Sequence, residues 1–264
     1  MKICFLEVSP KGPLSGDHRD HIKDFFKDDY YFVTHDEKSQ DKNFKEMNFN
    51  KGFVWAKNRN YLAKNVPRNY DYYWFSDYDV KYESKTNLNV CNQILKDLIL
   101  KNPAVMVCHD ESKIKSNNGG IKNNNSEKYR NIMMSNNQMK IIHRSLLDWF
   151  FPLPFHTGGK WDACHYFNVL ETPFIESVIC TYNVECKGLI SEKRSAGGNM
   201  DKIHDELLPC FKNKTKKINS HKEFKNHYIG VANNSAIKKF DFDSYNLNNY
   251  FNIEKLKKIV GEQK

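Results

Sequence analysis

Two aspartates separated by one residue, Asp77 and Asp79, are the residues whose types and spacing point most directly to chemistry. They follow the apolar run 71–75, which predicts a central strand that is buried on both faces. Carboxylates just past the carboxyl end of such a strand lie where open α/β sheets bind ligands. Their oxygens suit Mg²⁺ or Mn²⁺, which bind carboxylates together with phosphates. The pair therefore predicts a metal site that neutralises charge on a diphosphate leaving group.

The spacing of the two aspartates is not specific by itself. Aspartate makes up about one residue in twenty of an average protein, so roughly one such pair is expected by chance in a chain of this size. The sequence Asp241-Phe242-Asp243 repeats it in a polar context. Only the first pair follows an apolar strand, which is itself preceded by a predicted helix carrying Lys57-Asn-Arg-Asn60. The alternative for the first pair is an ordinary surface turn.

The composition is that of a globular protein with a basic surface. The chain has 264 residues, 14% of them aromatic, which excludes disorder throughout and allows one large domain or two small ones. The net charge of +9 attracts polyanions such as nucleic acid, anionic lipid or phosphorylated small molecules. The alternative is a solvated, lysine-rich surface.

The cysteines and the apolar segments bear on the cellular compartment of the protein and on its relation to membranes. The seven cysteines are scattered and none has the spacing of a zinc knuckle, so we expect reduced thiols and a cytoplasmic protein. The first ten residues are too interrupted for a signal peptide. No apolar stretch is long enough to span a bilayer, so we expect no transmembrane segment.

The elements that must position the aspartates alternate along the first part of the chain. The pattern predicts strands at 3–8, 30–34, 71–75 and 104–108 and helices at 20–27, 53–64 and 88–100. This order argues for a mostly parallel sheet flanked by helices, in one α/β domain with a peripheral C-terminal part. Further on, the sequence predicts a strand over 131–139, helices at 141–151 and 161–170, and strand material at 178–189.

The runs Lys57-Asn-Arg-Asn-Tyr-Leu-Ala63 and Asp71-Tyr-Tyr-Trp-Phe-Ser-Asp-Tyr-Asp-Val80 resemble the GT-A fold glycosyltransferases. In that family an Arg-Asn helix precedes a strand that ends in a DxD motif. The resemblance covers the first 110 residues by order of elements and extends more loosely to residue 190. It implies a GT-A-like catalytic domain at 1–210, with a nucleotide-binding half at 1–110, an acceptor half at 111–210 and a basic extension at 211–264 packed on it.

The resemblance also implies roles by position for residues of the donor site. Asp77 would contact the donor ribose or a metal, and Asp79 would ligate the metal. Arg59 would approach the nucleobase or a phosphate; its alternative is a solvated helix charge. The remaining donor-binding residues would be Val8, Ser9 and Pro10, which line the nucleotide pocket, and Asp36, which touches the nucleobase or simply forms a turn.

A second candidate segment is Gly158-Gly-Lys-Trp-Asp162, a turn leading into a predicted helix. In inverting members of the family, an acidic residue at a helix N-terminus beyond the central strands acts as general base. Asp162 fits that place, since the positive helix end favours its ionised form, and such a base contributes about 10²–10⁴ in rate. Trp161 could stack on the acceptor sugar. The alternatives are a helix cap for Asp162 and a core position for Trp161, with rival carboxylates at Asp148, Glu171 and Glu176.

Two further features complete the predicted site. The basic, glycine-hinged segment 192–198 could close Lys193 and Arg194 over the diphosphate and exclude water, or it could be a plain exposed loop. The family often uses a late histidine as an additional metal ligand. His204 is the candidate nearest that segment, with His221 and His227 as rivals.

Together these features predict a glycosyltransferase dependent on Mn²⁺ or Mg²⁺, of the inverting type. It would move a sugar from a UDP- or GDP-sugar to a sugar or glycan hydroxyl, without a specific nucleic acid partner. One alternative is a metal-dependent nuclease or nucleotidyltransferase, which predicts a third carboxylate such as Asp110 or Glu111 and two metals. Another is a basic nucleic-acid-binding module, against which the diffuse charges count.

Overall fold

The structure is a computed structural model of the chain. It describes residues 1–10, 12, 17–35, 39, 45–49, 55–84, 86, 88–108, 129–131, 138–153, 166–167, 170–181, 183–188, 214–216 and 245–250.

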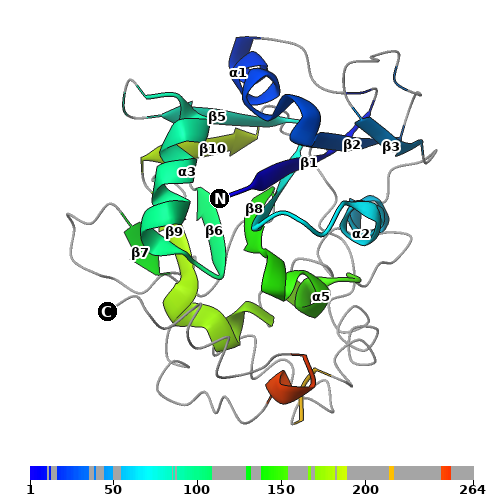
Figure 1. Cartoon of the computed structure of the whole chain (residues 1–264), viewed down its shortest axis with the longest axis vertical. Coiled ribbons are helices and arrows are strands. Elements are labelled where there is room, and N and C mark those ends of the chain that lie inside the picture. The colour runs from blue at the N-terminus through cyan, green and yellow to red at the C-terminus, as the bar shows by residue number, and fades with distance from the viewer. Residues whose placement is uncertain are drawn as a thin grey trace, which may run out of the picture.

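A large mixed sheet forms the centre of the molecule (Figure 1). In the described residues it has eight strands in the order β3-β2-β1-β4-β8-β6-β9-β7. Their bounds are β1 Ile3–Ser9, β2 Tyr30–Thr34, β3 Lys45–Phe49, β4 Tyr72–Asp77, β6 Val105–Cys108, β7 Tyr129–Asn131, β8 Met139–His143 and β9 Val178–Thr181. Only β8 and β7 run against the direction that the others share. The prediction of a mostly parallel α/β sheet is confirmed.

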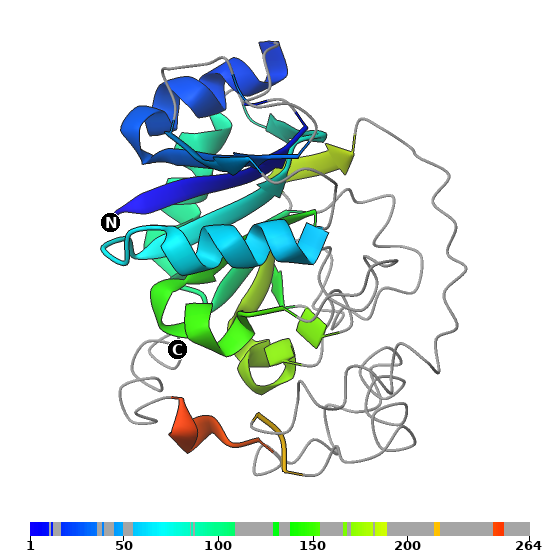
Figure 2. The same ribbon diagram turned by 90° about the vertical axis from the view of Figure 1, so that its right-hand side faces the viewer.

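Helices cover both faces of this sheet (Figures 1 and 2). α1 and α3 lie on one face, and α2 and α5 lie on the other. A separate two-stranded sheet of β5 and β10 lies beside α1 and α3. The bounds are α1 Asp17–Phe26, α2 Trp55–Asn65, α3 Val90–Lys101, α5 Leu147–Phe150, β5 Val80–Ser84 and β10 Val184–Gly188.

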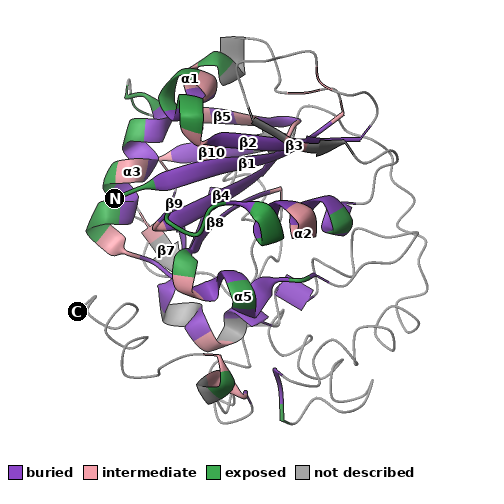
Figure 3. Cartoon of the chain, turned by 45° about the vertical axis from the view of Figure 1, so that its right-hand side comes forward, coloured by how far each residue is buried: buried purple, intermediate pink, exposed green. Residues whose placement is uncertain are grey.

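The strand β4 is the centre of the core, and every residue of it is buried (Figure 3). Its side chains alternate between the two faces of the sheet. On the α1 face, the Trp74 ring meets Phe5 and Phe26 with centroids 5.4 and 5.6 Å apart. On the α2 face, Phe75 stacks on Phe151 at 4.9 Å. Each such aromatic ring buries about 150–250 Å², so the strand is fixed from both sides.

The chain between 131 and 151 differs from what the sequence predicts. The structure has β8 at Met139–His143, then a 3₁₀ turn at Arg144–Leu146, and only the four-residue helix α5. The prediction of a helix over 141–151 is therefore wrong for its first third. β8 is a strand because it pairs antiparallel with β4 on one side and β6 on the other. These partners are remote in sequence, and local periodicity does not report them.

Other strands also differ from the sequence prediction. β3 lies in a stretch for which the sequence predicts no strand, and it pairs in parallel with β2 at the edge of the sheet. The strand material predicted at 178–189 is two strands, β9 in the large sheet and β10 in the small one. Of the strand predicted over 131–139, residues 131, 138 and 139 are described: Asn131 ends β7, Met139 begins β8, and Gln138 lies in neither strand.

The described part of the C-terminal segment is attached to the domain through Lys214. Its buried ammonium donates hydrogen bonds to the Trp149 carbonyl and to the Tyr166 hydroxyl. The rings of Trp149, Tyr166 and Tyr250 lie 5.2–5.8 Å from it, within cation–π range. These contacts join Lys214 and Tyr250 to the domain, while the boundary at residue 210 and the packing of the whole extension 211–264 stay predictions. In the part of the chain that the structure describes, no helix combines the length and apolar character needed to cross a membrane.

Candidate functional site

The carboxyl ends of three parallel strands meet at one edge of the sheet. Val8 in β1 lies level with Asp77 in β4 and with Val33 in β2, and Ser9 lies level with Thr34. The chain segments that leave these strands therefore start side by side, where open α/β sheets bind their ligands. Three predicted donor-binding residues, Val8, Ser9 and Pro10, come to this edge.

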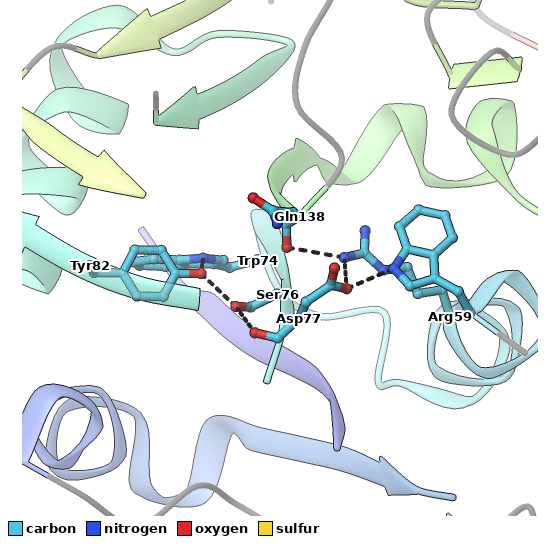
Figure 4. A network of polar contacts seen from close by, with 7 residues as sticks. Arg59, Trp74, Ser76, Asp77, Tyr82 and Gln138 are labelled. Carbon is cyan, nitrogen blue, oxygen red and sulfur yellow. Dashed lines mark hydrogen bonds and ion pairs between the residues drawn. The ribbon is translucent and has the colours of Figure 1, made fainter. Parts of the chain in front are cut away.

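The carboxylate of Asp77 accepts two hydrogen bonds on the same oxygen (Figure 4). Trp55 Nε1 donates to Asp77 Oδ1 at 2.7 Å, and Arg59 Nη2 donates to it at 2.9 Å. The Asp77 backbone N–H donates to the Gln138 carbonyl at 2.8 Å, and Arg59 Nη2 reaches the same carbonyl at 3.2 Å. Both ends of the aspartate, side chain and backbone, are thus held by one network.

Arg59 is enclosed in the protein, with only 1% of its side chain exposed. Its guanidinium lies 4.0 Å from the centroid of the Trp55 ring and 5.9 Å from that of Phe75. The alternative of a solvated helix charge is therefore wrong. Arg59 is instead the buried countercharge of Asp77, in a charge-assisted hydrogen bond of the strong kind.

The helix α2 presents these donors because of its spacing. Trp55 and Arg59 are four residues apart and share one helix face, which packs toward β1 and β2. The next residue, Asn60, exchanges two hydrogen bonds with the backbone of Leu153, at 2.8 and 2.6 Å. The Arg-Asn pair thus fixes α2 on both sides, against β4 and against the chain that follows α5.

Asp79 lies in the turn between β4 and β5 and is 6% exposed. A chain of hydrogen bonds sets the geometry of this turn (Figure 4). Tyr82 donates to Ser76 Oγ at 2.6 Å, and Ser76 Oγ donates to the Asp77 carbonyl at 2.9 Å. Trp74 Nε1 donates to the Tyr82 hydroxyl at 3.1 Å. The two strands that flank the turn are therefore tied together beneath it.

The last residue of β10 comes close to the same turn. Gly188 pairs with Val80, the residue directly after Asp79. The chain that leaves β10 therefore begins beside the aspartate turn. Lys193 and Arg194 follow five and six residues later and lie outside the described residues.

The other predicted site residues divide into two groups. Asp36, Trp161, Asp162, Lys193, Arg194 and His204 lie outside the described residues, so their roles stay predictions. Two of the rival carboxylates have other partners. Asp148 pairs with Arg68 at 3.2 Å on the surface, and Glu171 is 1% exposed in an ion pair with Lys140.

Several members of the network are not predicted from the sequence. Trp55, Ser76, Tyr82 and Gln138 all contact Asp77 or the strands around it. Only Trp55 had a signal in the sequence, its four-residue spacing from Arg59, which puts the two side chains on one helix face. The partners Tyr82 in β5 and Gln138 just before β8 depend on strand pairing between segments that are remote in sequence.

The donor set fits a divalent cation that is held mainly through a substrate. Mg²⁺ typically takes one or two protein carboxylates together with substrate phosphates and water. Asp77 and Asp79 supply two carboxylates at the ligand-binding edge of the sheet. Among the described residues, no group of three or more His, Cys, Asp or Glu could hold a metal ion.

Comparisons with known proteins bear on the fold. No family model matches the chain, and no curated protein sequence matches it. The structure is similar to that of residues 1–349 of S. aureus TarS in complex with UDP-GlcNAc, with a TM-score of 0.50, 14% identity, and coverage of 89% of this chain and 75% of that one. It is also similar to GalNAc-T7 with UDP, GalNAc and Mn²⁺, with a TM-score of 0.50, 8% identity, and coverage of 99% and 55%.

A third similar structure is UDP-glucose pyrophosphorylase complexed with UDP-glucose, with a TM-score of 0.46, 10% identity, and coverage of 90% and 100%. The chain spans about half the length of the GalNAc-T7 structure. At these identities the likeness concerns the fold alone, and the fold is GT-A-like.

Proposed function

We propose that this protein is a glycosyltransferase that uses a nucleoside diphosphate sugar and a divalent metal. The observation that carries the proposal is the Asp77–Asp79 turn, buried at the common carboxyl edge of β1, β2 and β4 and held there by Arg59. The TarS structure contains UDP-GlcNAc, and the GalNAc-T7 structure contains UDP, GalNAc and Mn²⁺. Both support a nucleotide-sugar donor, and the second supports a metal.

Each residue of the site would have its own role. Asp79 and Asp77 would hold Mn²⁺ or Mg²⁺, which when bound neutralises charge on the leaving diphosphate. The chain from Val8 to Pro10 would line the nucleotide pocket. Arg59 offsets one negative charge and keeps the Asp77 carboxylate in place. This preorganised arrangement costs no reorganisation when the reaction occurs.

The predicted acceptor side completes the scheme. Asp162 would take the proton of the acceptor hydroxyl, and Trp161 would stack on the acceptor sugar. Lys193 and Arg194 would contact the diphosphate from the segment that begins beside Asp79. Transfer in one displacement step would invert the configuration of the sugar.

The two-metal alternative makes a different demand on the site. A nuclease or nucleotidyltransferase of that kind needs a third carboxylate beside the pair. Within the ranges that the structure describes, no cluster of three ligating residues occurs. Asp110 and Glu111, the candidates from the sequence, lie outside those ranges.

The proposal is tested by thermal unfolding with nucleotides and metal. UDP, GDP and their sugars are each added with and without Mn²⁺, since a ligand that binds the folded state stabilises it by mass action. At 100 times the dissociation constant the gain is about 2.7 kcal/mol, a rise of roughly 5–10 °C for a domain of this size. We expect one base to give this shift, and only with the metal.

Two matched variants separate the site from its chance repeat. Asp79→Ala should abolish the metal-dependent shift, and Asp243→Ala, in the second Asp-x-Asp sequence, should leave it unchanged. The reaction class follows from the products: nucleoside diphosphate plus free or transferred sugar for a glycosyltransferase, nucleoside monophosphate plus sugar phosphate for pyrophosphate-bond cleavage. The proposal is wrong if no nucleotide shifts the midpoint or if Asp79→Ala responds as the parent does.

A further inference from the structure

One oxygen of Asp77 is fully committed to the protein. A carboxylate oxygen has two lone pairs in its plane, each able to accept one hydrogen bond. On Oδ1 the two donors are Trp55 Nε1 at 2.7 Å and Arg59 Nη2 at 2.9 Å. Any ligand that Asp77 binds must therefore use Oδ2.

The two donors cannot easily move away from Oδ1. Trp55 and Arg59 are 3% and 1% exposed, and the guanidinium carbon lies 4.0 Å from the centroid of the indole. Arg59 Nη2 also bonds the Gln138 carbonyl, which accepts the backbone N–H of Asp77 as well. Turning the carboxylate would break two bonds at once and leave buried donors unsatisfied, at a cost of about 1–3 kcal/mol each.

We propose that Trp55 and Arg59 are positioning residues that restrict Asp77 to one-oxygen ligation and so make the metal site select Mn²⁺ and Mg²⁺ over Ca²⁺. This inference rests on the proposed function. Ca²⁺ takes six to eight oxygens and can use a bidentate carboxylate, whereas Mg²⁺ demands near-ideal octahedral geometry and is bound through one or two carboxylates together with substrate phosphates and water. An aspartate that can offer only Oδ2 withholds the additional oxygen that Ca²⁺ would use.

The test is a competition between the two cations in the substitution Trp55→Phe. This variant keeps an aromatic ring under Arg59 and leaves the charges unchanged, but it removes the Nε1–H donor. Binding of Mn²⁺ is followed by electron paramagnetic resonance in the presence of UDP or GDP, whichever gives the larger thermal shift, and Ca²⁺ is then titrated in. The quantity measured is the ratio of the Ca²⁺ to the Mn²⁺ dissociation constant.

We expect Trp55→Phe to lower this ratio by about 3- to 10-fold, since loss of a partner that orients a metal ligand typically changes affinity by about 10- to 100-fold. Trp149→Phe is the matched control. It also removes a buried indole donor, here to the Leu170 carbonyl at 2.9 Å. It should lower the thermal midpoint and keep the parental ratio, because general destabilisation affects both cations alike.

Arg59→Lys is the second test variant, which keeps the charge and loses the planar, shared Nη2. Its ratio of Ca²⁺ to Mn²⁺ dissociation constants should also fall below the parental value. If Trp55→Phe does not fold, Arg59→Lys alone tests the positioning role. A parental ratio in the folded variants overturns the positioning role. If Asp79→Ala loses Mn²⁺ binding while Trp55→Phe and Arg59→Lys keep the parental ratio of Ca²⁺ to Mn²⁺ dissociation constants, only this inference is wrong. If the parent binds no Mn²⁺ with either nucleotide, the proposed function is wrong and the inference with it.

Discussion

The hydroxyl of Tyr82 in β5 donates a 2.6 Å hydrogen bond to Ser76 Oγ in β4, across the turn that carries Asp79. Ser76 Oγ in turn donates a hydrogen bond to the Asp77 carbonyl, and Trp74 Nε1 donates one to the Tyr82 hydroxyl. The two strands belong to different sheets, so backbone pairing does not join them. This relay of side chains is therefore a principal device that fixes the position of Asp79.

The first prediction concerns Tyr82→Phe, which removes the hydroxyl and retains the ring that packs against Trp74 at 5.2 Å. Two buried groups lose their partner, so the free energy of unfolding should fall by about 1–3 kcal/mol. Because the turn loosens, the Mn²⁺-dependent affinity for the nucleoside diphosphate should fall about 10-fold. Isothermal titration and urea unfolding measure the two effects.

Tyr61→Phe is the control for this variant. The Tyr61 hydroxyl also donates to a single acceptor, the Met47 carbonyl at 3.3 Å, in a partly buried position. Its loss should change stability slightly and leave nucleotide affinity at the parental value. Equal affinity in the parent and in Tyr82→Phe would show that the relay does not position the site.

Part of this architecture could be predicted from the sequence because its signals are local. The apolar run that forms β4 indicates a strand buried on both faces, and the structure buries all of it. The i, i+3, i+4 pattern of α3 predicts a helix at 88–100, and the structure has it at Val90–Lys101 with Asn89 as its N-cap. Asp77 and Asp79 could be placed at the end of β4 for the same reason.

The remainder depends on contacts between segments that are far apart in the chain. Residues 141–151 have apolar spacing that suits a helix, but β8 forms because β4 and β6 each supply a pairing edge. Lys140 is charged, and nothing near it in sequence indicates that it is fully buried beside Glu171, 31 residues on. Arg59 likewise meets Asp77 only through the packing of α2 on the sheet.

The second prediction concerns the buried ion pair of Lys140 and Glu171, whose side chains are 0% and 1% exposed. Lys140→Met leaves a carboxylate buried without its countercharge, so we expect a loss of about 3–5 kcal/mol. The double variant Lys140→Met/Glu171→Leu removes both charges and should recover most of that loss. Chemical unfolding of the parent, both single variants and the double variant gives the coupling energy.

The exposed pair of Arg68 and Asp148 is the comparison for this cycle. Its side chains are 48% and 84% exposed, so Arg68→Met should change stability by less than about 1 kcal/mol. A similar small effect for Lys140→Met would mean that the Lys140–Glu171 pair is solvated and not part of the core.

The third prediction is a pH dependence of stability that originates at His143. Burial, with a contribution from the charge of Arg144, lowers the pKa of His143 from 6.5 to about 4, and Asp71 opposes this only in part. The unfolded chain thus binds the proton more readily between these two values, so the stabilising effect is complete above pH 6.5 and is lost as the pH falls toward 4. The loss should reach roughly 3 kcal/mol at pH 4, at 1.36 kcal/mol per pKa unit.

His143→Phe keeps the ring contact with Tyr72, whose centroid lies 5.1 Å away, and removes the titration. Urea unfolding between pH 7.5 and 4 should show a shallower decline for this variant than for the parent, and parallel curves would contradict the assignment.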